Sequence, residues 1–219
     1  MTPIEKFKAL PEKTQQEILD KHRYRYTEYH EWWDSVYEQF AEKMEELGII
    51  IHTRSYNSAK GHLYTEPAIY FSGFSSQGDG ACFNGEIYDF GKAFERHSPL
   101  LLEHIGKISY RSVSWKNTGR YTHSNSLDFS EELGIAETDY EGLRLLAQEQ
   151  LETELNVEWE RFVDAVEKEV KGFCDKLYSD LEDENEHLTS DESVLEFLDA
   201  NDELEEILKE YEDEESTSP

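Results

Sequence analysis

One short polar loop, between two aromatic stretches, carries residue types that could grip a ligand: Ser75, Ser76, Gln77, Gly78, Asp79 and Gly80. Ser and Asp side chains bond to nearby backbone groups, and glycines at 78 and 80 would permit positive φ, so the pattern is typical of a tight turn between strands. The alternative is an anion-binding nest of backbone N–H groups. No Lys or Arg lies between Lys60 and Lys92, and no Walker or dinucleotide motif is present, so we favour the turn.

Cys82 follows this loop and would be the nucleophile of an enzyme that used residues 75–82. The sequence offers no base beside it, so a buried strand cysteine is the favoured interpretation. The histidines lack metal-binding spacing, and a calcium-like pattern at 199–210 has Leu204 where glycine is needed. We therefore expect no metal and no cofactor.

Acidic residues suggest a second kind of site. Residues 128–219 hold 33 acids against 6 Lys and Arg, whereas residues 1–127 hold 17 against 15. Such a field excludes direct binding to nucleic acid, whose phosphates need Lys and Arg, and favours a basic protein surface as the partner. The acids expected to form the binding surface are Glu158, Glu160, Glu167, Glu169, Glu203 and Glu206.

The elements that would position the loop are predicted for residues 1–130. Apolar residues spaced by three or four predict one helix over 14–47, with Gly48 as its left-handed cap. The following residues predict an antiparallel sheet and a short helix: strands at 49–56, 68–74 and 81–90, a helix at 92–105, and a hairpin of 109–116 with 120–127 around a loop at 117–119. The fold class is α+β.

An acidic helical region is predicted for residues 131–211. A long helix from 138 to 181 and a second from 190 each carry an apolar stripe, separated by an acidic linker at 180–187. We expect the two stripes to pack together as an antiparallel pair that displays its carboxylates. Residues 212–219 have no apolar side chain and are expected to be a disordered tail.

Two stretches in the first part resemble a known family. "EYHEWWDSVYEQFAEKMEELGI" and "AIYFSGFSSQGDGACFNGEI" are similar to a family of uncharacterised phage and mobile-element proteins with a Trp-Trp-Asp helix and an FSGF-x-SQGDGA-x-F motif. Some members are labelled antitoxins. The resemblance covers about residues 10–90 and implies no reaction, ligand or catalytic residue.

Three functions remain open at this point. The leading one is a non-enzymatic phage or mobile-element protein that neutralises a host protein, as an antitoxin or anti-defence inhibitor, with nucleic-acid mimicry as one form of it. The alternatives are an enzyme that uses the loop, and a structural module whose helices pair with a partner's helices. Without a leader-like or membrane-spanning stretch, we expect a cytoplasmic location, in the host cell if the protein is phage-encoded.

Overall fold

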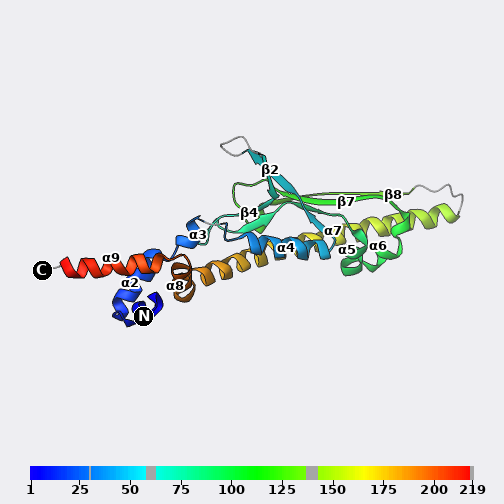
Figure 1. Cartoon of the computed structure of the whole chain (residues 1–219). Helices are drawn as coiled ribbons and strands as arrows, with labels where there is room; N and C mark the ends of the chain where they lie inside the picture. The colour runs from blue at the N-terminus through cyan, green and yellow to red at the C-terminus, as the bar shows by residue number, and fades with distance from the viewer. Residues whose placement is uncertain (30, 58–62, 137–142, 218–219) are drawn as a thin grey trace. The chain divides into compact units, whose positions relative to one another are not determined.

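The computed structural model describes residues 1–29, 31–57, 63–136 and 143–217 (Figure 1). Its contacts group the chain into two compact units, which we describe separately. The terminal unit joins Met1–Asp34 to Leu181–Pro219, and the central unit is Ser35–Asp180. The predicted boundary near residue 130 follows a change in composition, whereas these units follow packing. The predicted boundary also led us to expect residues 1–130 to fold alone, whereas the central unit extends to Asp180.

The central unit is built on antiparallel strands. A four-stranded sheet has the order β1 (Ile49–Ile51), β6 (Gly85–Ile87), β7 (Ile108–Asn117), β8 (Leu127–Ile135). Two further pairs join β2 (Thr53–Asn57) to β3 (Leu63–Pro67) and β4 (Ile69–Phe71) to β5 (Ala81–Phe83). Together with the helices, these antiparallel strands confirm the predicted α+β class.

Helices contribute the apolar side chains that cover this sheet: α4 (Asp34–Glu46), α5 (Phe90–His97), α6 (Pro99–Glu103) and the long α7 (Leu143–Leu188). Phe94 of α5 and Phe162 of α7 lie edge to face with ring centroids 4.9 Å apart. Trp159 of α7 donates from Nε1 to Glu131 of β8 at 2.6 Å. Since α7 supplies part of the core, the central unit needs residues beyond 130.

The predicted hairpin is right in its first strand and wrong in its second. β7 pairs with β8 over Ile108–Asn117 and Leu127–Ile135, and the connection contains a 3-10 turn, η2, at Ser124–Ser126. The sequence analysis placed the second strand at residues 120–127, which lie nearer to β7 in sequence and contain no Asp or Glu. Glu131 was instead assigned to the acidic region. Its partner, the Trp159 indole that donates to it, belongs to α7 and is distant in sequence.

The predicted helix over residues 14–47 is wrong, because the chain forms separate helices there. The terminal unit holds α1 (Pro3–Ala9), α2 (Glu12–His22) and α3 (Arg25–Tyr29), and α4 follows from Asp34. Helix α2 begins after Pro11, not at Thr14. The end of the predicted helix is confirmed, since Gly48 follows α4 with φ +79°. A Cβ there would meet Asp89 at 2.8 Å.

The apolar stripes of the acidic region are buried, but not against one another as predicted. Leu155, Phe162 and Val170 of α7 are buried in the central unit. The stripes of α8 (Asp191–Ala200) and α9 (Glu203–Thr217) instead pack on α1 and α2. Their cluster contains Phe7, Ile18, Leu19, Val194, Leu198, Leu204, Ile207 and Leu208.

Two predicted irregular segments lie within helices. The expected acidic linker at 180–187 is part of α7, which ends at Leu188. The expected tail begins inside α9, which runs to Thr217, and residues 218–219 lie outside the described part. A 3-10 turn, η1, spans Ile105–Lys107, ahead of β7.

Candidate functional site

The Ser75–Gly80 loop is organised around the Asp79 carboxylate. Its Oδ2 accepts hydrogen bonds from the backbone N–H groups of Ser75 at 2.8 Å and Ser76 at 2.7 Å. These bonds, those from Ser76 first, hold the pKa of Asp79 below its ordinary value. The backbone N–H groups of Ser75 and Ser76 are directed to Asp79, and the Asp79 N–H donates to the Ser76 carbonyl at 3.0 Å. The geometry is therefore that of an internally satisfied turn.

The sequence suggested positive φ for Gly78 and Gly80, but neither residue adopts it. Glycine is needed at both positions because neighbouring residues lie too close for a side chain. A Cβ on Gly78 would lie 2.7 Å from the Tyr121 ring, and one on Gly80 would lie 2.5 Å from Cβ of His123. The left-handed conformation belongs to Gly73, with φ +61°. The loop is thus fitted against residues 121–123, where Thr122 Oγ1 bonds to the hydroxyl of Ser72 and to the Gly80 carbonyl.

Cys82 is in no position to act as a nucleophile. Its side chain is wholly buried, and burial raises the pKa of the thiol to about 12. Cys174 is likewise buried, and its pKa is also raised by burial. Both are free cysteines and behave as core side chains.

Two of the six predicted acidic binding residues join α7 to other elements of the central unit. Glu158 accepts a hydrogen bond from the buried hydroxyl of Ser98 at 2.7 Å. Glu169 lies 3.2 Å from Nε of Arg96 and 2.9 Å from Nε2 of His97, and its side chain is 19 % exposed. These carboxylates join α7 to α5 and to the start of α6.

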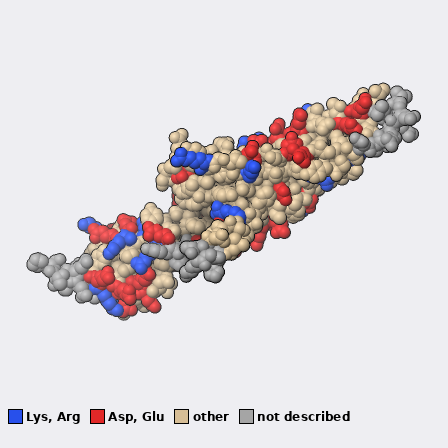
Figure 2. Space-filling model, turned by 90° about the horizontal axis from the view of Figure 1, so that it is seen from above, with Lys and Arg blue, Asp and Glu red and all other residues tan. Residues whose placement is uncertain are grey.

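The other four predicted acids are divided between the two units. Glu160 is exposed, and Glu167 is paired with Lys171 at 2.5 Å, both in the central unit. In the terminal unit Glu203 lies 3.1 Å from Nε of Arg25, and Glu206 is exposed. Figure 2 shows acidic side chains spread over the visible face, with Lys and Arg among them. Each unit is acidic: by sequence, the terminal unit has a net charge of −17 and the central unit −12.

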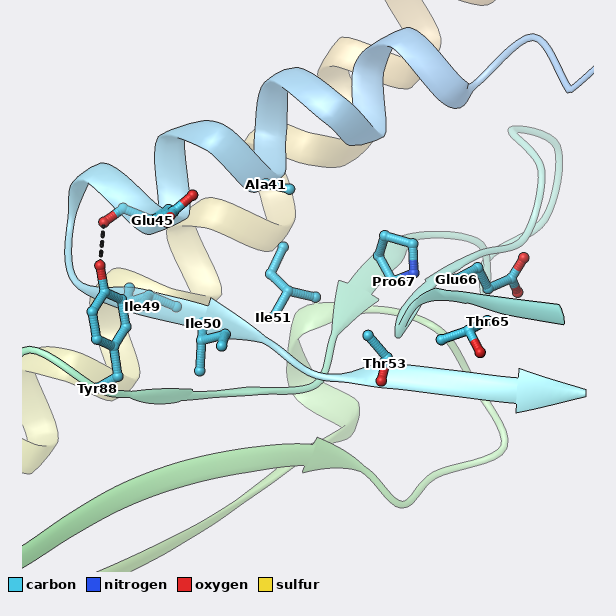
Figure 3. Close-up of a pocket in the computed structure, with 10 residues that line it drawn as sticks. All are labelled: Ala41, Glu45, Ile49, Ile50, Ile51, Thr53, Thr65, Glu66, Pro67 and Tyr88. Atoms are coloured by element: carbon cyan, nitrogen blue, oxygen red, sulfur yellow. Dashed lines mark hydrogen bonds between the residues drawn. The ribbon is translucent and has the colours of Figure 1, made fainter.

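A groove beside β1 is a feature that sequence reasoning missed (Figure 3). It has a volume of about 420 Å³ and lies between α4, β1 and the start of the β2–β3 hairpin. Its lining residues are Ala41, Glu45, Ile49, Ile50, Ile51, Thr53, Thr65, Glu66, Pro67 and Tyr88. The sequence signal was the Ile49–Ile51 run, which we had interpreted only as a strand.

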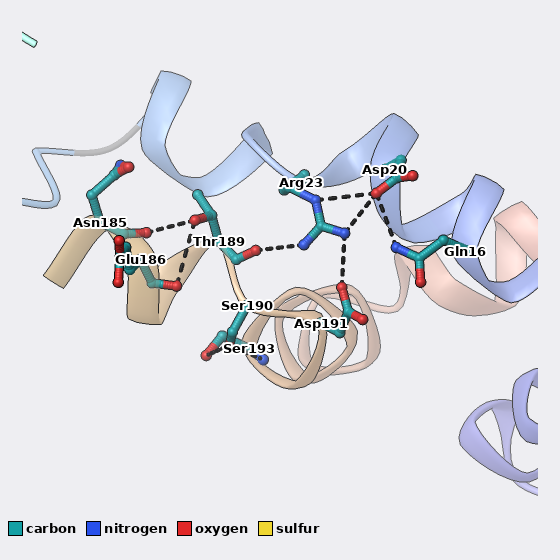
Figure 4. Close-up of polar contacts among 9 residues, drawn as sticks. All are labelled: Gln16, Asp20, Arg23, Asn185, Glu186, Thr189, Ser190, Asp191 and Ser193. Carbon is teal, nitrogen blue, oxygen red and sulfur yellow. Dashed lines mark hydrogen bonds and ion pairs between the residues drawn. The ribbon is translucent and has the colours of Figure 1, made fainter. Parts of the chain in front are cut away.

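A polar cluster in the terminal unit is centred on Arg23 (Figure 4). Its guanidinium donates to the Thr189 carbonyl at 2.7 Å, to Asp191 at 2.7 Å and to Asp20 at 2.6 Å. The bond to Asp20 is the main cause of the raised pKa of Arg23. The cluster ties the end of α2 to the start of α8.

Among the described residues, none of the helices has both the length and the apolar character that a bilayer crossing needs. No curated protein and no solved structure matches the chain. A family model described as a domain of unknown function (DUF8835) matches residues 32–191. The match extends well beyond the 10–90 region of the sequence resemblance and includes the SQGDGA loop, the groove and all of α7. With more than half of its length matched, the chain belongs to this family of domains, DUF8835.

Proposed function

We propose that this protein is a non-enzymatic binding protein that neutralises a protein partner by occupying the partner's basic surface. The observation that supports this most directly is the net negative charge of both units, −17 and −12 by sequence. Two separate folded bodies of the same sign project a field that attracts Lys- and Arg-rich surfaces. A basic surface that normally holds nucleic acid is the natural target, and competition with a duplex would reveal mimicry.

The biological setting belongs to the same proposal. The Trp-Trp-Asp and SQGDGA motifs resemble those of phage and mobile-element proteins, so the partner would be a host or toxin protein in the host cytoplasm. An antitoxin or an anti-defence inhibitor needs no reaction of its own, only an affinity that outcompetes the partner's ligand.

Burial of the apolar stripes favours this function over a helix-pairing module. Such a module would need an uncovered apolar face, whereas the stripes of α7, α8 and α9 are packed inside their own units. An enzyme that used the loop has less support, because Asp79 is bonded within the turn and the Cys82 thiol is buried.

Affinity capture from host lysate with the full-length protein tests the proposal. Partner retained at about 50 mM NaCl should be released as the salt rises to about 300 mM, since screening weakens exposed charge pairs. A variant that neutralises four exposed acids should retain less: Glu154→Gln, Glu160→Gln, Asp164→Asn and Glu206→Gln.

The matched control changes the charge in the opposite direction. Lys8→Gln with Lys168→Gln removes two exposed cations and should strengthen retention at the same salt. If retention of the partner changed neither with salt nor with either variant, the proposal would be overturned. Release of the partner by duplex DNA would identify its nucleic-acid-binding surface as the target.

A further inference from the structure

We propose that the groove beside β1 binds an extended segment of the partner as an added strand, with an apolar side chain in the groove and Lys or Arg beside it. The preference for a basic segment rests on the proposed function, whereas the strand addition rests on geometry alone.

β1 is an edge strand of the four-stranded sheet. Among the described residues, no strand pairs with it on the side away from β6. The hydrogen bonds at its two ends fix the orientation of its backbone. Gly48 accepts from Tyr88 N–H at 3.0 Å, and His52 donates to the Asn84 carbonyl at 2.9 Å. Because backbone groups alternate along a strand, those of Ile49 and Ile51 point away from β6, towards the open edge.

The opposite edge of the sheet differs in a way that makes β1 the candidate. β8 carries Asp128, Glu131 and Glu132 along its length, and charged side chains on an edge discourage a further strand. β1 consists of three isoleucines and carries no charged side chain. An unprotected apolar edge in a folded protein is a template for pairing with another chain.

The groove provides space for the side chain of an added strand. Ala41 and Pro67 contribute to its lining from α4 and β3, and Ile51 points into it from β1 (Figure 3). Two apolar residues of the lining remain exposed, Ile50 at 48 % and Tyr88 at 51 %. Tyr88 is held in place by its hydroxyl, which donates to the Glu45 carbonyl at 3.1 Å.

The charge of the groove and its surroundings determines which kind of segment would bind there. Of the described residues, the lining includes Glu45 and Glu66 and no Lys or Arg. Glu66 is paired with Arg54 at 2.5 Å, so the Glu45 side chain is the carboxylate left to attract a cation. Glu38 and Glu42 are also exposed and follow the same face of α4, since they precede Glu45 by seven and three positions. A segment that alternates apolar and basic residues therefore matches the site.

A labelled synthetic peptide of about seven residues that alternates Lys with Val or Ile is the probe. Fluorescence anisotropy would measure its affinity for the full-length protein, and amide exchange by NMR would report on Ile49 and Ile51. On binding, exchange at these two amides should slow, while amides of β8 should not change. The same peptide with N-methyl groups on alternate residues keeps its charge and should bind at least about tenfold more weakly.

Variants of the protein separate the groove from general charge attraction. Ala41→Phe should fill the groove, and Glu45→Gln should remove its carboxylate while leaving the Tyr88 bond to the Glu45 backbone; each should weaken peptide binding. Glu46→Gln removes an exposed carboxylate of the same helix that does not line the groove, and should have little effect. Thermal melts of all three show whether each variant is folded.

The outcomes distinguish this inference from the proposed function. Equal affinity for the methylated peptide, with Ile49 and Ile51 exchange unchanged, would overturn the strand addition even if salt-sensitive capture of a partner persisted. An uncharged peptide with Thr in place of Lys tests the geometry alone. If it slowed exchange at Ile49 and Ile51 as strongly as the Lys peptide, strand addition at the groove would be supported and the preference for a basic segment would be wrong.

Discussion

Close packing between the SQGDGA loop and residues 121–123 makes Gly80 the most restrictive position of the loop. An added Cβ would lie 2.5 Å from Cβ of His123 and 3.0 Å from the Thr122 carbonyl oxygen, which is backbone and cannot move alone. Gly80→Ala should therefore lower the free energy of unfolding by about 1–3 kcal/mol, as overpacking does. Chemical denaturation measures the change.

Gly172→Ala is the matched control for this substitution. Gly172 is inside α7, and apart from that helix's own backbone and the neighbouring residues, no described atom lies within 4 Å of a Cβ there. Alanine there should stabilise the protein by about 0.5–1 kcal/mol, because it restricts the unfolded chain and favours the helix. Equal effects of the two substitutions would contradict the close approach at Gly80.

The Asp79 carboxylate predicts a pH dependence at the same loop. Its pKa is lowered in the folded protein, so its contribution to stability is complete above the ordinary pKa of Asp and is lost as the pH falls through the lowered value. Asp79→Asn should therefore lower the melting temperature near neutral pH, and the difference from the unmodified protein should shrink in acid. A difference that grew in acid would contradict the turn geometry.

At the scale of elements, substitutions of Glu169 and Glu160 should distinguish an acid that stabilises the fold from one that is only exposed on the surface. Glu169→Gln weakens the contacts with Arg96 and His97, which join α7 to α5, and should cost about 1–3 kcal/mol of unfolding free energy. Glu160→Gln is the matched substitution on the exposed side of the same helix and should cost less than about 0.5 kcal/mol. The reverse order would contradict the packing of α7.

The sequence was informative about which side of the long helix is buried. The apolar stripe that spacing predicts there contains Leu155, Trp159 and Phe162, and all three are buried. Periodicity does not specify what covers a stripe, however. The same argument therefore paired α7 with α8 and α9, whereas the stripes of α8 and α9 pack on Phe7 and Ile18, more than 170 residues away in sequence.

The candidate sites, like the helix packing, could be predicted only in part from the sequence. Composition revealed an acidic protein, and Ser75–Gly80 connects two paired strands, β4 and β5, as expected. Which carboxylates are engaged depends on tertiary neighbours such as Ser98 for Glu158, and spacing along α7 carries no information on them. Predicting the groove would have required knowing that β1 is an edge strand, and this depends on the strand order of the sheet.

At the scale of the whole molecule, removal of residues 131–219 should prevent cooperative folding of the remainder. A 1–130 fragment would lose most of β8 and the α7 face that covers Phe94, exposing an aromatic patch. This replaces our sequence-based expectation that residues 1–130 fold alone. A fragment of residues 35–180, the central unit, is the control and should melt cooperatively in differential scanning fluorimetry. A cooperative melt of 1–130 would restore the sequence-based division.

Net charge predicts how the full-length protein responds to salt. At −29, like charges repel one another in the compact state more than in the expanded chain, so folding works against its own field. Raising NaCl from about 10 mM to about 300 mM shortens the Debye length from about 30 Å to below 10 Å and should raise the melting temperature near pH 7.

The control for this effect is a pH near the pI of about 4.5, where the net charge is small. There the same salt range should change the melting temperature little, because there is little repulsion left to screen. A salt response of equal size at both pH values would point to preferential exclusion of the salt instead of screening. A melting temperature that fell with salt at pH 7 would show that local pairs, such as Arg23 with Asp20 and Asp191, outweigh the repulsion between the remaining acids.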